Sequence, residues 1–361
     1  MTTIPVKLKH KYNVLIGTGM LRRAGRELRR ALPSTNSQVW VITSPTVRRH
    51  WGAQLEESLQ REKLGYRVLE MNDGEPAKKL QTVERLAEQM VAGGADRKCL
   101  VVAFGGGVVG DSAGFLASIF MRGVPVVQIP TTVLAQVDAS IGGKTGVNLD
   151  AGKNLIGTFH QPAVVLVDPA ILETLDEREF RAGLFESLKC GVIRDSKLFD
   201  FMTAKASQIL SRDRKVLLRI IVDSVRVKAA VVGADERESG LRRILNFGHT
   251  IGHALEAATG YTALLHGEAV AWGMIAAAFI ARDADICDGE TAECIQAAVH
   301  EYGPLPPVTV APQEIAACMQ SDKKAVAGKI HWVLPQKIGK IKIVSGIEPA
   351  VIEKALQHIC R

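Results

Sequence analysis

Apolar residues in the first half of the chain switch repeatedly between short runs and helical spacing. Short apolar runs predict buried strands, and apolar positions three and four apart predict amphipathic helices. The predicted strands are 38–43, 66–71, 98–104 and 124–129, with two more inside 4–17 that meet at His10 and Lys11. The predicted helices are 19–31, a stretch that ends near Arg61, and 80–91. Strands that alternate with helices indicate a parallel, doubly wound sheet.

The pattern changes near Glu173, after which strand-like runs give way to long helical stretches. These helical stretches are 176–211, 213–234, 247–258, 266–285, 289–302, 311–320 and a closing helix at 349–359. We expect two domains, with the boundary near residue 175. The predicted fold class is an α/β nucleotide-binding domain with a parallel sheet (1–175), followed by an all-helical domain (176–361) apart from a late hairpin at 329–335 and 340–344.

A glycine-rich turn, Gly105 to Asp111, joins the strand 98–104 to the helical residues 112–120. Glycines between a strand and a helix let backbone N–H groups approach a phosphate, and the helix N-terminus adds a favourable partial charge. The turn is not the usual GxGxxG motif after a first strand. A dinucleotide pyrophosphate is the preferred ligand, and a tight structural turn is the alternative.

Two further stretches, 136–148 and 152–157, are rich in glycine and polar groups and are expected to be site-forming loops. Arg122, Lys144 and Lys153 lie in this part of the chain and could offer cations to a phosphate. The alternative is that they are three ordinary surface cations.

Candidate metal chemistry gathers between Asn246 and Met274, where three of the nine histidines lie. His249 and His253 are four residues apart, so they share one face of a helix, as in zinc-binding helices. A carboxylate from elsewhere would complete a three-ligand site with an open position. The alternative is a pair of core histidines. Glu186 and Lys189 are three apart on a predicted helix, which alone is typical of a surface pair.

Composition narrows the function classes. The chain has 361 residues, 47% hydrophobic and 5% aromatic, with a net charge of +7. Few aromatics and no dense basic run argue against nucleic-acid binding. Six scattered cysteines without CxxC spacing fit reduced thiols. The N-terminus shows no signal-peptide pattern, and no apolar run is long enough to span a bilayer, so we expect a soluble cytoplasmic protein without a membrane partner.

Taken together, the motifs closely resemble the 3-dehydroquinate synthase family over nearly the whole chain. The matching stretches are GGGVVGD at 105–111, PTTVLAQVDASIGGKTGVN at 130–148, GKNLIGTFHQP at 152–162, LRRILNFGHTIGHALE at 241–256 and LHGEAVAWGM at 265–274. The resemblance implies NAD and one divalent metal ion, zinc or possibly cobalt, as cofactors. A homodimer is also expected.

The resemblance also implies a role for individual residues. The metal ligands would be Glu186, His249 and His266, so that His253 faces substrate or handles protons instead of binding metal. The NAD contacts would be Glu75, Lys78, Gly106, Gly107, Val108, Asp111, Thr131, Thr132, Lys153, Asn154 and Thr174. The substrate and catalytic residues would be Arg122, Asp138, Lys144, Lys189, Lys228, Glu238, Arg242, Asn246, His253 and one lysine of Lys323 and Lys324, with Lys324 preferred.

The implied reaction converts 3-deoxy-D-arabino-heptulosonate 7-phosphate into 3-dehydroquinate and phosphate. It combines transient oxidation by NAD, β-elimination of phosphate, re-reduction and aldol closure. The alternatives are an NAD-dependent polyol dehydrogenase and another sugar-phosphate cyclase. Two positions depart from the family pattern: Ser44 stands where Asn is usual, and Cys190 follows Lys189 where Tyr is usual.

Overall fold

The computed structural model describes residues 1–325 and 330–360, with side chains described for 1–319 and 330–360. The chain divides into two units. The first unit contains Met1–Asp176 and Lys228–Arg237, and the second contains Glu177–Val227 and Glu238–Arg361. The sequence predicts one boundary near residue 175, whereas in the structure residues 228–237 return to the first unit.

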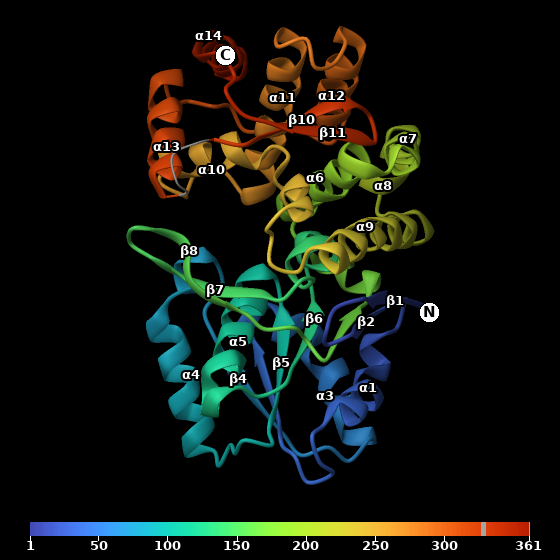
Figure 1. Ribbon diagram of the computed structural model, residues 1–361. Coiled ribbons are helices and arrows are strands. Elements are labelled where there is room, and N and C mark those ends of the chain that lie inside the picture. Colours follow the sequence, from blue (N-terminus) through green and yellow to red (C-terminus); the bar gives the residue numbers. More distant parts are fainter. Residues whose placement is uncertain (326–329, 361) are drawn as a thin grey trace. The chain divides into compact units, whose positions relative to one another are not determined.

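The first unit is built on a seven-stranded sheet (Figure 1) with the order β1-β2-β9-β6-β5-β3-β4. All neighbouring strands are parallel except β1 and β2, which pair antiparallel. The strands are β1 (Thr2–Val6), β2 (Tyr12–Ile16), β3 (Val39–Thr43), β4 (Tyr66–Glu70), β5 (Leu100–Gly105), β6 (Val126–Pro130) and β9 (Val164–Val167). The predicted parallel α/β sheet is confirmed, but the sequence analysis missed β9, whose four residues are too few to show a period.

Each central strand contributes side chains to a core on both faces of the sheet. On β3, Trp40 and Ile42 join one core while Val39 and Val41 join the other. This alternation follows from the two-residue repeat of a strand. The first core is covered by α4 (Leu80–Ala92) and α5 (Gly107–Ile119), and the second by η1 (Leu21–Arg23), α1 (Ala24–Ala31) and α3 (Ala53–Arg61) (Figure 1).

The glycine-rich residues predicted as loops form ordered structure instead. Ala135–Ala139 is a π-helical turn (η5), and β7 (Lys144–Leu149) pairs antiparallel with β8 (Gly152–Phe159). A Cβ on Gly157 would lie 2.2 Å from the carbonyl oxygen of Thr145, so the glycine lets the two strands approach. The loop prediction is therefore wrong at Lys144 and Lys153, because glycines here serve close strand pairing as well as turns.

In its described residues, the second unit is helical apart from one hairpin, in which β10 (Trp332–Lys337) pairs antiparallel with β11 (Lys340–Val344). Its helices are α6 (Glu177–Arg194), α7 (Ser196–Ala204), α8 (Ala206–Leu210), η7 (Leu241–Asn246), α10 (His249–Ala258), α11 (His266–Asp283), α12 (Gly289–Glu301), α13 (Pro312–Ala325) and α14 (Pro349–Ile359). Helix α9 (Arg214–Ala234) begins in this unit, and its last residues belong to the first.

The single helical stretch predicted at 176–211 is wrong, because the chain breaks there into α6, α7 and α8. Asp195 begins α7 as its N-cap, where its side chain accepts a hydrogen bond from the backbone of Leu198 at 3.2 Å. Gly191 then allows α7 to pack against α6, since a Cβ there would lie 2.9 Å from Phe199.

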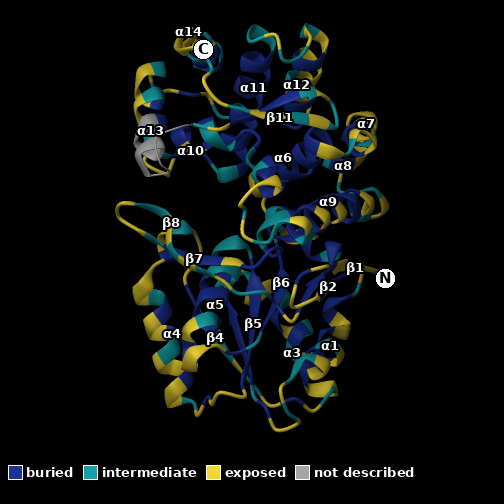
Figure 2. Cartoon of the chain, viewed as in Figure 1, coloured by how far each residue is buried: buried dark blue, intermediate teal, exposed yellow. Residues whose placement is uncertain are grey.

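Helix α11 is the centre of the second unit and contacts α6, α10, α12 and α14. Its residues from Gly267 to Ala281 are buried almost without interruption, so the helix is covered by other elements on all sides (Figure 2). None of the helices in the described residues combines the length and apolar character needed to cross a membrane.

Candidate active site

Three imidazoles meet where α10 and α11 begin. His249 and His253 lie one turn apart on α10, and His266 is the first residue of α11. One ring nitrogen from each of the three lies within 4.8 Å of the others. The ring centroid of His249 is 5.3 Å from those of both His253 and His266. The structure therefore brings together all three histidines that the sequence analysis singled out.

Glycines let the helices approach closely enough for this cluster to form. A Cβ on Gly273 of α11 would lie 1.9 Å from the carbonyl oxygen of Gly248, which itself precedes α10 in a left-handed conformation with φ of 79°. A Cβ on Gly267 would lie 1.9 Å from the carbonyl oxygen of Ala182 on α6. A side chain at either glycine would prevent these contacts. The backbone of α11 therefore packs directly against the backbones of α6 and of the start of α10.

Helix α6 places a glutamate and a lysine beside the three histidines. The side chains of Glu186 and Lys189 are each 1% exposed and form an ion pair. The Oε1 atom of Glu186 lies 3.8 Å from Nε2 of His249. Apart from the ion pair with Lys189, neither carboxylate oxygen of Glu186 accepts a hydrogen bond from the described residues. A buried carboxylate with few partners for its lone pairs is costly, so these oxygens fit a site that a further cation completes.

In both His249 and His266, the hydrogen bond at one ring nitrogen leaves the other nitrogen available to bind a metal. Nδ1 of His249 lies 3.1 Å from the carbonyl oxygen of Phe247, and Nδ1 of His266 lies 3.2 Å from Oε2 of Glu256. Both oxygens accept, so each Nδ1 carries a proton, and in the neutral ring each Nε2 has its lone pair available. Together with Glu186 they form an N/O donor set that suits a divalent ion such as zinc or cobalt.

Burial and charge shift the pKa values of His249 and His266 in opposite directions. Burial lowers the pKa of His249 well below its usual value, and the charge of Lys189 and the neighbouring imidazoles lower it further. Burial also opposes the charged form of His266, but the hydrogen bond and charge of Glu256, with help from Glu186, raise its pKa overall. His249 is therefore neutral near pH 7, as a metal ligand must be.

The first unit carries the predicted phosphate site at the end of β5. Helix α5 begins at Gly107 with Gly106 as its N-cap, so Gly107 and Val108 lie in its first turn. The helix thus starts five residues before the position expected from the sequence. A Cβ on Gly105 would lie 2.6 Å from Val109, and one on Gly106 would lie 3.0 Å from the side chain of Thr132. The first N–H groups of a helix have no acceptor within the helix, so this N-terminus is of the kind that suits an anionic ligand.

A polar network beside this helix joins three segments of the first unit. Nζ of Lys78 lies 2.5 Å from Oδ2 of Asp111 and 2.5 Å from Oδ1 of Asn154. The side-chain amide of Asn148 donates to Oε1 of Glu75 at 2.7 Å. Burial raises the pKa of Asp111, an effect that Lys78 opposes and that Glu75 and Asp138 reinforce. Four predicted NAD contacts, Glu75, Lys78, Asp111 and Asn154, thus lie in one network.

The remaining predicted residues of the first unit are more scattered. Lys228 forms an ion pair with Asp138 on η5. Thr174 is exposed and accepts a hydrogen bond from Nε1 of Trp51 at 2.8 Å. Arg122 is exposed and has φ of 73°, next to Met121 with φ of 47°. Thr131 is buried, Lys144 is exposed and Lys153 is half-buried.

In the second unit, the side-chain amide of Asn246 donates to Oε1 of Glu238 at 2.6 Å. Arg242 on η7 is only 2% exposed, whereas His253 is the exposed member of the imidazole cluster. Lys324 belongs to α13, but its side chain and that of Lys323 lie outside the described residues.

Two residues of these networks were not singled out in the sequence analysis. Glu256 follows His253 by three residues and His249 by seven, a spacing that places it on the same face of α10 and could have identified it. Tyr12 of β2 accepts a hydrogen bond from the backbone of Gly142 at 3.0 Å. No local pattern could have indicated this contact between residues 130 positions apart.

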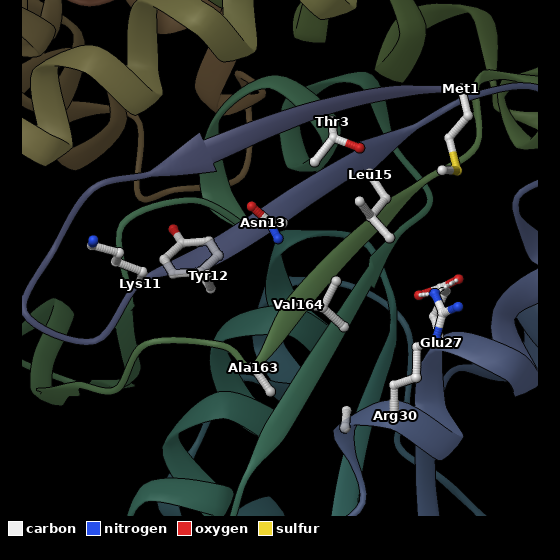
Figure 3. A pocket seen from close by; sticks show the side chains of 11 residues that line it. Met1, Thr3, Lys11, Tyr12, Asn13, Leu15, Glu27, Arg30, Ala163 and Val164 are labelled. Atoms are coloured by element: carbon white, nitrogen blue, oxygen red, sulfur yellow. Dashed lines mark hydrogen bonds and ion pairs between the residues drawn. The ribbon is translucent and has the colours of Figure 1, made fainter.

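A separate pocket lies near one edge of the sheet (Figure 3), with a volume of about 420 Å³. It is lined by Met1, Thr3, Lys11, Tyr12, Asn13, Leu15, Glu27, Arg30, Ala31, Ala163 and Val164. These residues include none of the predicted site residues. Its size alone therefore does not make it a candidate active site.

Solved structures similar to this chain include two sugar-phosphate cyclases. The chain is 30% identical to a 2-epi-5-epi-valiolone synthase from Streptomyces hygroscopicus with NAD⁺ and Zn²⁺ bound, with a TM-score of 0.88 and 96% of each chain covered. It is 27% identical to a 2-deoxy-scyllo-inosose synthase complexed with carbaglucose-6-phosphate, NAD⁺ and Co²⁺, with a TM-score of 0.88 and 99% of each chain covered. A probable glycerol dehydrogenase from Sinorhizobium meliloti, at 16% identity and a TM-score of 0.68, shares the fold.

Family models and curated relatives both point to a single family among these enzymes. Residues 68–182 match the 3-dehydroquinate synthase N-terminal model, and residues 183–325 match the 3-dehydroquinate synthase C-terminal model. The 3-dehydroquinate synthase of Koribacter versatilis is 53% identical over 360 residues, which cover 99% of this chain and 98% of that protein. That of Solibacter usitatus is 49% identical over 347 residues, covering 96% of each. The chain therefore belongs to the 3-dehydroquinate synthase family.

Proposed function

We propose that this enzyme converts 3-deoxy-D-arabino-heptulosonate 7-phosphate into 3-dehydroquinate and phosphate, a step of the shikimate pathway. Family membership over nearly the full chain supports this activity. The structural observation that carries the proposal is the meeting of buried Glu186 and Lys189 with half-buried His249 and His266 in the second unit. A carbon–oxygen lyase that eliminates phosphate needs both a metal-binding group and cations, and this cluster contains both.

We assign the metal ligands as Glu186, His249 and His266. In the neutral form each of the two imidazoles has its Nε2 lone pair available, and apart from the ion pair with Lys189 the Glu186 oxygens accept no hydrogen bond from the described residues. When bound, a divalent ion, zinc or cobalt, supplies Lewis-acid stabilisation of negative charge on a substrate oxygen. His253 is the exposed imidazole of the cluster, so we assign it to proton transfer.

We assign NAD to the first unit. The N-terminus of α5, with Gly106, Gly107 and Val108, suits the pyrophosphate. The other proposed contacts are Glu75, Lys78, Asp111, Thr131, Thr132, Lys153, Asn154 and Thr174. NAD supplies a hydride acceptor that also returns the hydride, so the proposed reaction consumes no cofactor. Four of these residues, Glu75, Lys78, Asp111 and Asn154, belong to the network around α5, which supports their assignment to one ligand.

The substrate carries a phosphate and a carboxylate, and the chain offers cations for both. We assign anion binding to Arg122, Lys144, Lys189, Lys228, Arg242 and Lys324, and hydroxyl binding to Asp138 and Asn246. A ketone at C5 acidifies the hydrogen at C6, which permits β-elimination of phosphate. Glu238, which Asn246 holds through a hydrogen bond of 2.6 Å, joins His253 in handling protons.

We further propose that the protein acts in the cytoplasm as a homodimer and binds neither nucleic acid nor membrane. All six cysteines are thiols, which supports a reducing compartment. Light scattering of the purified protein tests the dimer, and a molar mass equal to the 39.0 kDa chain would exclude it.

The activity is tested with purified protein, the heptulosonate phosphate, NAD and zinc. We expect release of one phosphate per substrate without net absorbance change at 340 nm, because the hydride is returned. An NAD-dependent polyol dehydrogenase would instead accumulate NADH. Absence of phosphate release from protein with a full metal complement contradicts the proposal, and release only from a different sugar phosphate would identify another cyclase activity.

A further inference from the structure

Glu256 is a buried carboxylate for which the proposed reaction has no use. It lies on α10, is 1% exposed, and is a neighbour of the imidazole cluster. Its Oε2 atom lies 3.2 Å from Nδ1 of His266. Burying a carboxylate is costly unless its partners hold it in place, so the contact with His266 needs a physical reason.

The hydrogen bond decides which nitrogen of His266 carries the proton. An ionised carboxylate only accepts hydrogen bonds, so Nδ1 of His266 donates, and in the neutral ring that a metal binds, the lone pair is on Nε2. In the same way, Nδ1 of His249 donates a hydrogen bond to the carbonyl oxygen of Phe247 at 3.1 Å. The two bonds therefore select the same tautomer in both rings, although one acceptor is a neutral carbonyl group and the other carries a charge.

The helix geometry makes the orientation of His266 rigid. Glu256 lies two turns after His249 on α10, so one helix supplies both an imidazole and the acceptor for the second imidazole. A Cβ on Gly252 would lie 3.0 Å from the carbonyl oxygen of Ala269, which shows how closely α10 and α11 pack between these residues. The acceptor and the ring are thus held on two helices in backbone contact.

We propose that Glu256 is a positioning residue that fixes the tautomer and ring orientation of His266 and strengthens its Nε2 as a metal ligand. Carboxylates that accept from a ligating imidazole act in this way in metal sites, and their loss costs about 10- to 100-fold in metal affinity. The proposal deepens the proposed function, because it rests on His266 being a metal ligand.

The first test measures the binding of Co²⁺ alone to the metal-depleted protein, with visible absorption as the readout. Glu256→Gln keeps the size of the side chain and can still accept a hydrogen bond, but it removes the charge. We expect the dissociation constant for Co²⁺ to rise about 10-fold or more, with an altered d–d spectrum. The melting temperature of the metal-depleted variant should stay near that of the wild type, which separates positioning from a general loss of stability.

Asp168→Asn provides the matched control. Asp168 is also a buried carboxylate, 2% exposed, and it accepts backbone hydrogen bonds from Gly19 and Leu21 in the first unit. The same carboxylate-to-amide change there should affect stability and leave Co²⁺ affinity unchanged. Equal Co²⁺ affinity of Glu256→Gln and wild type, measured on folded proteins, would overturn the positioning role.

A second measurement on the unaltered protein keeps the test valid even if Glu256→Gln does not fold. In the zinc-loaded protein with ¹⁵N-labelled histidine, the ring shifts of His266 should place the proton on Nδ1 and the metal on Nε2. A proton on Nε2 would overturn the positioning role alone. Failure of the wild-type protein to bind Co²⁺ or zinc at all would instead contradict the proposed metal site.

Discussion

At the scale of single residues, the neighbours of His266 support its proposed role as a metal ligand. It begins α11, and its Nδ1 is held by Glu256 while the carboxylate of Glu186 lies near enough to favour its charged form. Sequence spacing singled out His249 and His253, but Glu186 was indicated only by the family resemblance. A glutamate three residues before a lysine is usually an exposed pair, and only tertiary packing buries this one.

Replacing His266 tests the ligand assignment. We expect His266→Ala to lose bound zinc and nearly all phosphate release while the fold persists, since Glu186 and His249 alone leave the donor set incomplete. Metal content by mass spectrometry and far-UV circular dichroism are the measurements. His331→Ala, which alters an exposed histidine of the same unit, should leave both unchanged. Full metal content in His266→Ala would show that another side chain is the ligand.

Cys99 and Cys294 differ in burial, and this predicts different thiol reactivity. Burial raises the pKa of Cys99 to about 11, with a smaller contribution from the charge of Asp96. Cys294 is exposed on α12. Because the thiolate is the nucleophile, a thiol reagent at pH 8 should label Cys294 quickly and leave Cys99 unlabelled in the native protein. Mass spectrometry of digested protein identifies the labelled site, and rapid labelling of Cys99 would contradict its burial.

At the scale of helices and strands, hydrophobic periodicity predicted most of the first unit. The strands β3, β4 and β5 and the helices α1 and α4 lie close to their predicted positions, because each carries its own apolar pattern. The hairpin of β7 and β8 was not predicted, since its glycines are explained only by the strand that each one faces. Likewise, Asp195 caps α7 and Gly191 lets α7 pack against α6, and apolar spacing does not reveal either contact.

The close contact of α10 and α11 predicts a stability difference between two glycines. Gly273→Ala would place a methyl group 1.9 Å from the carbonyl oxygen of Gly248, so we expect a loss of about 2 kcal/mol or more in the free energy of unfolding. Gly289 begins α12 with open space around its Cβ position, so Gly289→Ala should be neutral or stabilise by about 0.5 kcal/mol. Urea unfolding measures both changes. Equal stability of the two variants would mean that α10 and α11 are further apart.

At the scale of the whole molecule, the proposed cofactor sites belong to different units. The NAD residues lie in the first unit, and the metal ligands lie in the second. We therefore expect His266→Ala to bind NAD with a dissociation constant within about twofold of the wild-type value, because His266 is not among the proposed NAD contacts and independent sites behave additively. Calorimetry without substrate measures this, with Lys78→Met as the variant that should weaken NAD binding and spare metal binding. Loss of NAD affinity in folded His266→Ala would reveal coupling between the sites.

The return of residues 228–237 to the first unit has a consequence for any attempt to split the protein into two parts. Lys228 is the partner of Asp138, and Glu236 accepts a hydrogen bond from Gln161 at 2.9 Å. A gene fragment that stops at residue 176 would lack both partners, although it encodes every strand of the seven-stranded sheet. Two autonomous pieces therefore cannot be obtained by cutting the gene once. A circularly permuted or spliced design must carry this ten-residue segment along with the sheet.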